Sequence, residues 1–311
     1  MALRALVTGA GGFLGSHISY YLGKSGYQVA AVGRFNATSA IDTLYPNLLK
    51  LCGMTLPDAR FVAAVSEFKP DLVVHCAGTA SVGDSVHDPY GDFQRTVDVC
   101  AFTLETLRTC SPGIHFCLLS SAAVYGNPLH LPISEHDQCK PVSSYGYHKL
   151  LCEILADEYA KLHGLKVTVL RVFSAYGERL RKQLIHDLCY KFLLDESPYV
   201  ELFGSGEESR DFIHAVDVAR SIHFLHQNGS DGIYNVASGD QTTIKTVAAL
   251  IKRKLGSRKD IVFTGVNRTG DPLCWQANVS KLQSVGYRQS ISFSEGIEKY
   301  CEWFKNTYVR F

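Results

Sequence analysis

Tyr145 and Lys149 stand four residues apart in the segment YGYHK, and their side-chain types together can serve proton transfer. A four-residue step on a helix places both side chains on one face, so the ammonium of Lys149 can lie close to the phenol of Tyr145. Ser121 lies upstream of the pair, and a glycine loop lies near the N-terminus. This combination points to an enzyme that transfers a hydride.

The spacing alone does not identify a site, because Tyr20 and Lys24 repeat it. That second pair falls on the segment expected to form the helix after the glycine loop. The structural alternative for Tyr145 is therefore a packed aromatic residue with a surface lysine one turn later. The elements that position each pair must distinguish the two.

Short apolar runs alternate with longer helix-like segments through about residue 175, a pattern typical of a Rossmann-type α/β fold, a doubly wound parallel sheet with helices on both faces. Ligands of such a sheet bind beyond the carboxyl ends of its strands. A helix is expected from about Tyr145 to Leu162, with Ser143 and Ser144 as caps and Gly164 beyond its end. The expected strands are 5–8, 28–33, 72–76, 115–120 and 166–172.

The alternation loosens after about residue 175 into a segment with more glycine and asparagine turns. We expect residues 1–175 to form a dinucleotide-binding Rossmann domain that carries the catalytic residues. Residues 176–311 are expected to form mainly a smaller substrate-binding region, from which some segments return to the first domain.

The composition is that of an ordinary globular protein, with 311 residues, 46% hydrophobic, 20% charged and a formal net charge of +1. Near-neutral charge without basic clusters gives no reason to propose nucleic-acid binding. No apolar run reaches about 18 residues and no signal-peptide core precedes the glycine loop, so we expect no membrane partner and a cytoplasmic location. Cysteines without Cys-x-x-Cys spacing and scattered histidines predict reduced thiols and no metal site.

The segment LVTGAGGFLG at residues 6–15 follows an expected strand and opens an expected helix. Gly9, Gly12 and Gly15 fit a dinucleotide-binding turn: one permits the tight turn, one lets backbone N–H groups approach a pyrophosphate, and one allows close helix–strand packing. A glycine pattern alone is weak evidence, because any strand-to-helix turn needs small residues. Its position at the first strand is what indicates a cofactor.

The end of the second expected strand reads VGRFN, and it lacks the carboxylate that usually binds the ribose 2′-hydroxyl of NAD. A small residue followed by Arg34 leaves room for a 2′-phosphate and supplies a planar cation to hold it. We therefore favour NADP(H) as the cofactor. NAD(H) remains the alternative, because Arg34 could also be a solvated residue at a strand end.

Six short motifs follow one another along the chain: TGxxGxxG from Thr8, HCAG from His75, SSAAVYG from Ser120, YxxxK from Tyr145, LRVF from Leu170 and RDF from Arg210. In this order they resemble the extended short-chain dehydrogenase/reductase family. The likeness continues through Arg268-x-x-Asp271 and a closing helix with Gly296 and Trp303, so it covers nearly the whole chain. The segment from His75 to Pro89 looks closest to the UDP-galactose 4-epimerase branch.

The resemblance implies roles for the three catalytic residues. Tyr145 would be the base that removes a sugar hydroxyl proton while the hydride of the same carbon moves to the nicotinamide. Lys149 would favour the phenolate and bind the nicotinamide ribose, and Ser121 would hold the sugar oxygen, whereas Ser120 would be structural. Tyr145 follows the serine strand by one long loop, where the family expects it, and Tyr20 does not.

The binding residues also follow from the resemblance. A nucleotide-diphosphate sugar would be held at its diphosphate by Arg210 and Arg268, with Asp271 nearby, and at its sugar by Thr79, Tyr125 and Ser174. A homodimer would form through the helix of Tyr145 and its neighbour at about residues 91–110. The implied cofactor contacts are Gly9, Gly12, Phe13, Leu14, Gly15, Arg34, Met54, Ala77 and Lys149.

The residues after the catalytic serine indicate which of the family's reactions this chain can perform. Dehydratases and decarboxylases of this family place an acid there, and this chain has Ala122 and Ala123, so 4,6-dehydration is disfavoured. We favour a 4-epimerase acting on an NDP-hexose similar to UDP-glucose. An NADPH-dependent reductase of an NDP-4-keto sugar is the alternative that Arg34 supports, and a catalytically silent NADP(H)-sensing scaffold is the non-enzyme alternative.

Three departures from the family pattern concern contact residues. Met54 replaces an aspartate that contacts adenine, Thr96 replaces an asparagine that supports the active-site helix, and Ser174 replaces an asparagine that binds the nucleotide sugar. The sequence therefore does not fix the sugar or the nucleotide.

Overall fold

The computed structural model describes residues 2–35, 48–110, 113–266 and 274–309. Its contacts divide the chain into two compact units. The first unit comprises residues 1–126, 135–172 and 218–236. The second comprises residues 127–134, 173–217 and 237–311.

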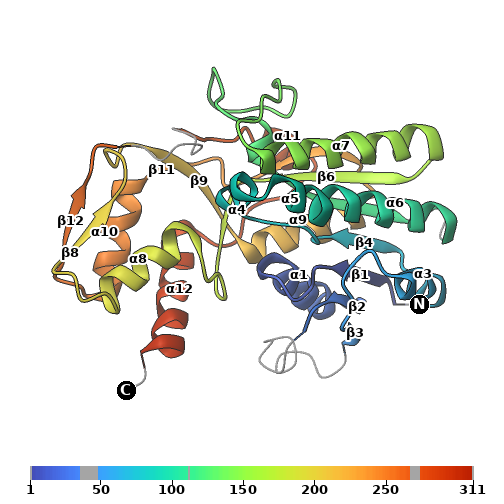
Figure 1. Ribbon diagram of the computed structural model, residues 1–311, viewed down its shortest axis with the longest axis horizontal. Helices are drawn as coiled ribbons and strands as arrows, with labels where there is room; N and C mark the ends of the chain where they lie inside the picture. Colours follow the sequence, from blue (N-terminus) through green and yellow to red (C-terminus); the bar gives the residue numbers. More distant parts are fainter. Residues whose placement is uncertain (1, 36–47, 111–112, 267–273, 310–311) are drawn as a thin grey trace. The chain divides into compact units, whose positions relative to one another are not determined.

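A seven-stranded sheet in the order β10-β6-β5-β4-β1-β2-β3 forms the centre of the first unit (Figure 1). All the pairings between these strands are parallel, and parallel neighbours need crossover connections rather than tight hairpins. This confirms the prediction of a Rossmann-type parallel sheet. The strands are β1 (Arg4–Thr8), β2 (Gln28–Gly33), β3 (Leu49–Cys52), β4 (Leu72–His75), β5 (His115–Ser121), β6 (Lys166–Val172) and β10 (Gly232–Val236).

Helices α3 (Ala59–Phe68), α6 (Val99–Cys110) and α7 (Ser144–His163) pack on one another over the sheet, and Figure 1 shows α6 and α7 side by side. The core beneath them is apolar, with Phe61 of α3, Leu104 of α6 and Phe116 of β5 fully buried. Burial of such side chains supplies the main favourable free energy of folding. Helices α1 (Phe13–Lys24) and α9 (Ala215–Gln227) contact each other through their aromatic side chains.

The segment between β4 and α6 carries two short helices, α4 (Val82–His87) and α5 (Pro89–Phe93), followed by a π-helical turn at Gln94–Asp98. Asp88 caps α5 by accepting a hydrogen bond from the backbone N–H of Gly91. Pro89 stands in the first turn of α5, where its missing N–H costs no helical hydrogen bond. This segment packs against α7, so it can position residues of that helix.

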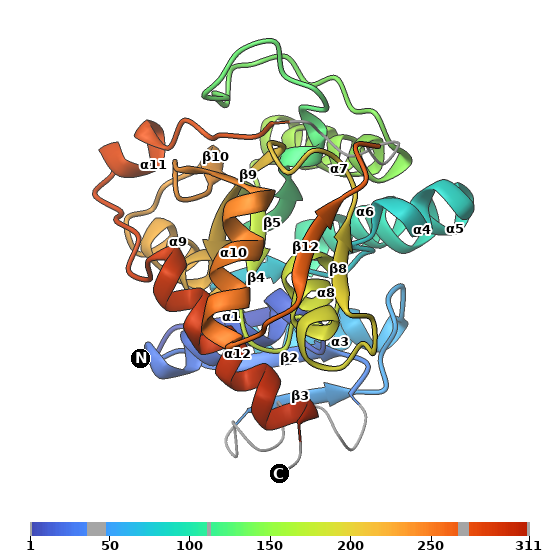
Figure 2. The same cartoon turned by 90° about the vertical axis from the view of Figure 1, so that its left-hand side faces the viewer.

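The second unit holds a three-stranded sheet in the order β11-β9-β7 and a two-stranded sheet of β12 and β8. Helix α10 packs against α8 and α12, and Figure 2 shows α10 beside α12. Asp211 and Asp217 are buried carboxylates that accept several hydrogen bonds from loop residues of this unit. The elements are β7 (Ser174–Tyr176), α8 (Gln183–Leu193), β8 (Tyr199–Leu202), β9 (Ser209–His214), β11 (Gln241–Thr243), α10 (Ile244–Leu255), β12 (Asp260–Phe263), α11 (Ser280–Ser284) and α12 (Phe293–Tyr308).

Two strands of the parallel sheet, β3 and β10, were not predicted from the sequence. Strand β3 is a four-residue edge strand in which Lys50 interrupts the apolar run, so its pattern is weak. Strand β10 returns to β6 from the second half of the chain. Among the described residues, no helix is long and apolar enough to cross a membrane, and the cysteines whose side chains are described are free thiols.

Candidate active site

The glycine loop joins β1 to α1 and lies against the end of β4. Gly9 has a φ of +65°, and a Cβ there would lie 2.7 Å from the backbone nitrogen of Ala77. A Cβ at Gly15 would collide with the carbonyl oxygen of Gly9. Only glycine permits both the backbone conformation and the close approach of helix to turn. Gly12 is the N-cap of α1, so the free N–H groups of that helix point out of the loop.

The end of β2 lies beside the same loop. A Cβ at Gly11 would lie 2.6 Å from the carbonyl oxygen of Arg34, and one at Gly33 would lie 3.4 Å from the nitrogen of Gly11. The side chain of Arg34 is exposed. The structure therefore brings the predicted cofactor residues at 9–15 and 34 together at the carboxyl ends of β1 and β2.

The other predicted cofactor contacts lie in different surroundings. Phe13 and Leu14 begin α1 and are half-buried. Ala77 follows β4, and its N–H donates to the hydroxyl of Thr8. Met54 is buried within the apolar core of the first unit. A contact between Met54 and an adenine stays a prediction.

Ser121 ends strand β5 and begins the turn that leads away from it. Its hydroxyl oxygen accepts a hydrogen bond of 3.2 Å from the N–H of Ala123. Ser120 points to the opposite face, as neighbours in a strand do, and donates to the carboxylate of Glu153 on α7. Arg171 on β6 donates to the same carboxylate at 2.7 Å, and the side chains of Arg171 and Glu153 are each 5% exposed. This buried pair fixes β5, β6 and α7 to one another.

Helix α7 presents Tyr145 and Lys149 next to the end of β5. Ser143 caps the helix by accepting from the N–H of Gly146, and Gly164 ends it in the left-handed conformation. Lys149 is 7% exposed, and its Nζ donates to the carbonyl oxygen of Leu119 on β5 at 3.0 Å. The same Nζ lies 5.9 Å from the centre of the Tyr145 ring.

The close approach of α7 to β5 depends on Gly146. A Cβ at this position would lie 2.6 Å from the carbonyl oxygen of Ala123, in the turn after Ser121. A larger residue would therefore push the Tyr145 end of the helix away from the serine. The structure brings Ser121, Tyr145 and Lys149 to the same edge of the first unit, and their catalytic roles stay predictions.

The buried ammonium of Lys149 acts on its surroundings. Burial, together with the Lys149 charge, lowers the pKa of His75, at the end of β4, to about 3. Burial also raises the pKa of the neighbouring Cys76 thiol to about 12, and the Lys149 charge opposes this rise. Both groups are therefore neutral near pH 7.

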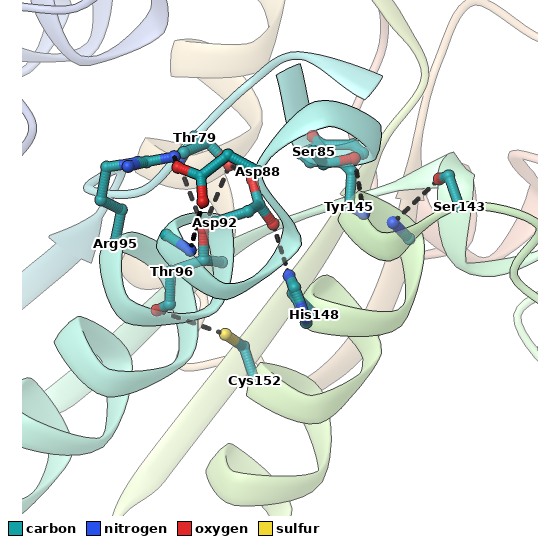
Figure 3. A network of polar contacts seen from close by, with 12 residues as sticks. Thr79, Ser85, Asp88, Asp92, Arg95, Thr96, Ser143, Tyr145, His148 and Cys152 are labelled. Carbon is teal, nitrogen blue, oxygen red and sulfur yellow. Dashed lines mark hydrogen bonds and ion pairs between the residues drawn. The ribbon is translucent and has the colours of Figure 1, made fainter. Parts of the chain in front are cut away.

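Thr79 lies in the segment between β4 and α4, and it belongs to a polar network that reaches α7 (Figure 3). Its hydroxyl donates to the carboxylate of Asp92, and its N–H donates to the hydroxyl of Thr96 at 3.2 Å. The other oxygen of Asp92 lies 2.5 Å from Nδ1 of His148. The hydroxyl of Ser85 accepts from the N–H of Tyr145 at 3.1 Å. Sequence reasoning did not identify Ser85, Asp92 or His148.

Tyr125 is buried inside the first unit. Its hydroxyl donates to the amide oxygen of Asn235 at 2.7 Å and accepts from Arg171 at 2.9 Å. Burial raises the pKa of this phenol, and Arg171 opposes the rise. The hydroxyl thus helps to fix β10 to β6, and a contact between Tyr125 and a sugar stays a prediction.

The predicted diphosphate and nucleotide-sugar contacts fall in the second unit. Ser174 begins β7 and pairs with Phe212 of β9. Arg210 on β9 donates from Nη1 to the carbonyl oxygen of Ser209, and its guanidinium carbon lies 5.9 Å from the Trp275 ring. Arg268 and Asp271 lie outside the described residues.

The comparison with protein-family models matches residues 5–237 to the NAD dependent epimerase/dehydratase family. The chain belongs to this family. The resemblance to extended short-chain dehydrogenases/reductases is thereby confirmed, and so is the expected enzyme class, a sugar-nucleotide epimerase or oxidoreductase that depends on a nicotinamide cofactor. The family match covers the glycine loop, Ser121, Tyr145 and Lys149.

Relatives within this NAD dependent epimerase/dehydratase family are named as 4-epimerases of UDP sugars. A putative UDP-glucose 4-epimerase of Methanocaldococcus jannaschii is 28% identical, over 97% of this chain and 98% of that protein. The structure of a UDP-N-acetylglucosamine 4-epimerase from Methanobrevibacter ruminantium, in complex with UDP-N-acetylmuramic acid, aligns with a TM-score of 0.89 at 27% identity and covers 98% of this chain and 99% of its own. The structure of the UDP-glucose 4-epimerase of Thermus thermophilus, in complex with NAD, aligns with a TM-score of 0.86 at 28% identity. The alignment covers 98% of this chain and 100% of the Thermus chain.

Proposed function

We propose that this protein is a nucleotide-sugar 4-epimerase in which Tyr145 is the base. The observation that carries the proposal is the buried ammonium of Lys149, held by the Leu119 carbonyl next to the Tyr145 ring and the Ser121 strand. A cation fixed beside a phenol favours proton removal by that phenol. The family membership and the activities for which the relatives are named support the same reaction.

In this reaction the residues of the chain bind and orient the sugar and move a proton. The Ser121 hydroxyl holds the sugar oxygen near Tyr145, which takes the proton of the C4 hydroxyl as the hydride leaves. A nicotinamide held at the glycine loop would supply the acceptor and donor for that hydride. Lys149 has three donors, of which the Leu119 carbonyl takes one, and we assign the others to the nicotinamide ribose and the phenol. Tyr145 then returns its proton to the C4 oxygen after the sugar has presented its other face.

The residues after Ser121 favour this reaction over dehydration. Positions 122 and 123 are both alanine, so neither offers a carboxyl group that could protonate a leaving hydroxyl. A second candidate is the NADPH-dependent reduction of a 4-keto sugar, which the exposed Arg34 beside the glycine loop favours. A 4-keto sugar reductase consumes NADPH, whereas an epimerase regenerates its cofactor.

Two incubations distinguish the two reactions. In the first, purified protein is mixed with UDP-glucose, UDP-N-acetylglucosamine or UDP-glucuronate, without added cofactor; in the second, it is mixed with NADPH and an NDP-4-keto sugar. Inversion at C4 with no net change in nicotinamide absorbance supports the epimerase. Consumption of NADPH in proportion to a supplied NDP-4-keto sugar, without inversion of the UDP sugars, would replace it with the reductase.

For the cofactor we propose an NAD(P) site in which Arg34 favours NADP(H). Arg34 follows β2 with its backbone next to Gly11, and its exposed guanidinium has the charge and planar geometry that suit a 2′-phosphate. The structure of the Thermus relative contains NAD, which is the alternative cofactor. Dissociation constants of NAD and NADP are measured for the wild type and for Arg34→Ala. Tighter NADP binding that the variant loses supports the proposal, and tighter NAD binding that is unchanged in the variant overturns it.

For the substrate we propose a nucleotide-diphosphate sugar whose diphosphate is held by Arg210 and Arg268, near Asp271. Two guanidiniums suit the two negative charges of a diphosphate. Thr79, Tyr125 and Ser174 are proposed to contact the sugar. Arg210→Ala should raise the KM for the nucleotide sugar more than it changes kcat, because the diphosphate does not react. The opposite change, a lowered kcat at unchanged KM, would contradict this role.

We also propose a homodimer in the cytoplasm, formed through α7 and the neighbouring segment at about residues 91–110, which ends with α6. Both carry exposed apolar residues: Phe93 is 38% exposed and Ile154 is 56% exposed. Exposed apolar side chains of this kind on neighbouring helices suit contact with a second copy. Light scattering after gel filtration should give the mass of a dimer, and Ile154→Lys should shift it toward the monomer. A monomeric wild type would refute the dimer.

A further inference from the structure

The carboxylate of Asp92 lies at the centre of a network that joins three elements of the first unit (Figure 3). Asp92 is on the short helix α5 and is fully buried. One of its oxygens accepts from the hydroxyl of Thr79, and the other faces Nδ1 of His148 on α7 at 2.5 Å. A buried carboxylate is costly unless donors satisfy both oxygens, and here both are satisfied.

The directions of these hydrogen bonds follow from the chemistry of the groups. The carboxylate accepts on both oxygens, so the single proton of the Thr79 hydroxyl goes to Asp92 and Nδ1 of His148 carries a hydrogen. The hydroxyls of Thr79 and Thr96 lie 3.2 Å apart, so the remaining donor between them is Thr96. The polar chain therefore runs from Thr96 through Thr79 to Asp92, and His148 donates to Asp92 from the other side. Each rotamer along it is fixed by the next group.

His148 occupies a particular place on α7, three residues after Tyr145 and directly before Lys149. Its side chain is 12% exposed, and the ring of Phe93 packs edge-on against it at 5.7 Å. A second contact holds the same end of α7: the N–H of Tyr145 donates to the hydroxyl of Ser85 on α4. Any rotation or shift of this end of α7 would thus break the bond between His148 and Asp92 and move Tyr145 at the same time.

We propose that Asp92 and His148 are positioning residues for the proposed epimerase reaction, on which this inference rests. Their bond fixes the Tyr145 end of α7 against the segment that carries Thr79. Through one carboxylate, the pair holds the base in its place and holds the Thr79 hydroxyl in one orientation beside the sugar. Neither residue reacts; they act through Tyr145 and Thr79.

The two sides of Asp92 should affect different kinetic constants. His148 positions Tyr145, the proposed base, so His148→Ala should lower kcat and change KM little. A loss of kcat of about 10- to 100-fold is the effect that a small misplacement of a reacting group produces. Thr79→Val removes the hydroxyl on the sugar side and should mainly raise KM. Asp92→Asn should affect both constants, because one amide group cannot accept from both donors on its two atoms.

The conservative variant His148→Asn gives the sharpest test. The amide nitrogen of asparagine lies close to where Nδ1 of histidine lies, so it can donate to Asp92. His148→Asn should therefore recover most of the kcat that His148→Ala loses. His163→Ala is the matched control, because His163 is an exposed histidine in the last turn of the same helix, and it should leave kcat and KM unchanged.

Amide hydrogen exchange provides a readout that does not depend on the proposed reaction. In His148→Ala, exchange should accelerate at residues 144–149 and 79–82 while the rest of the first unit keeps the wild-type rate, and His148→Asn should restore protection. Unchanged exchange in His148→Ala, or acceleration spread evenly over the unit, would overturn the proposal. If the wild type epimerises no nucleotide sugar, the proposed function fails while these exchange rates still decide the positioning role.

Discussion

Nζ of Lys149 lies 5.9 Å from the centre of the Tyr145 ring. The ammonium of Lys24 lies at the same distance of 5.9 Å from the Tyr20 ring on α1, so neither the spacing in sequence nor the distance separates the two pairs. Burial does, because Lys149 is buried and donates to Leu119 while Lys24 is exposed. A cation shielded from water acts much more strongly on a neighbouring phenol than a solvated one.

The two tyrosines make a matched pair of variants. Tyr145→Phe should lower kcat by about 10²- to 10⁴-fold, the usual contribution of a general base, while cofactor binding persists. Tyr20→Phe should leave turnover near that of the wild type. Rates of C4 inversion and the dissociation constant of the cofactor test this prediction. Equal losses in the two variants would show that Tyr145 has no special role.

The buried pair of Glu153 and Arg171 predicts an effect on stability. Glu153→Ala should lower the free energy of unfolding by about 3–5 kcal/mol, because it leaves the charge of Arg171 buried without its partner. The control is Asp157→Ala, which removes an exposed ion pair with Lys161 on the same helix and should change stability little. Urea denaturation of the two variants measures the difference, and similar midpoints would contradict the assigned role of the buried pair.

Two helical glycines should respond in opposite ways to alanine. Gly146→Ala places a methyl group against the carbonyl oxygen of Ala123, so it should destabilise the protein by about 1–3 kcal/mol and lower kcat. A Cβ at Gly23 in α1 would meet only a side-chain atom of Val29 at 4.0 Å. Gly23→Ala should therefore be neutral or should stabilise by up to about 1 kcal/mol. Thermal denaturation and turnover check both, and a Gly146→Ala protein with wild-type turnover would argue against the close approach.

Buried histidine predicts how stability depends on pH. His115 donates to Thr168, and burial lowers its pKa to about 3, with the charges of His226 and Lys166 acting in the same direction. Because histidine in an unfolded chain has a pKa of about 6.5, His115 binds a proton between about pH 6.5 and 3 in the unfolded chain but not in the folded chain. The free energy of unfolding should thus be greatest above pH 6.5 and should fall as the pH decreases toward 3.

The variant His115→Gln keeps a donor for Thr168 and cannot titrate, so it should flatten part of this decline. His87→Gln changes an exposed histidine and should leave the slope as in the wild type. Urea denaturation at several pH values between about 7.5 and 4 measures the slopes, which report the protons taken up on unfolding. Identical slopes for wild type and His115→Gln would mean that His115 does not contribute.

The parts of the fold that the sequence predicted are those with strong local patterns. The strands β1, β2, β4, β5 and β6 are nearly continuous apolar runs, as strands buried on both faces must be. Strand β10 was not predicted because its pairing with β6 depends on residues far away in the chain. No local pattern in the sequence indicates that this segment pairs with β6.

The same distinction holds for the candidate site. The glycine loop and the pair of Tyr145 and Lys149 are short-range motifs, so the sequence could predict them. The contact between Asp92 and His148 joins residues 56 positions apart, on two helices that meet only through tertiary packing. An aspartate next to a phenylalanine on a short helix resembles any capping or surface residue, and only the burial of Asp92 distinguishes it.

Strand β10 also has a consequence for how the chain folds. It pairs with β6 only after residues 173–231 have intervened, and Asn235 on it accepts the hydroxyl proton of Tyr125. During synthesis, β6 is therefore left as an open, apolar sheet edge until residue 236 has emerged from the ribosome. Open edges of this kind pair readily with other chains. We expect the period between the synthesis of β6 and that of β10 to be when the nascent protein is most prone to aggregate and depends most on chaperones.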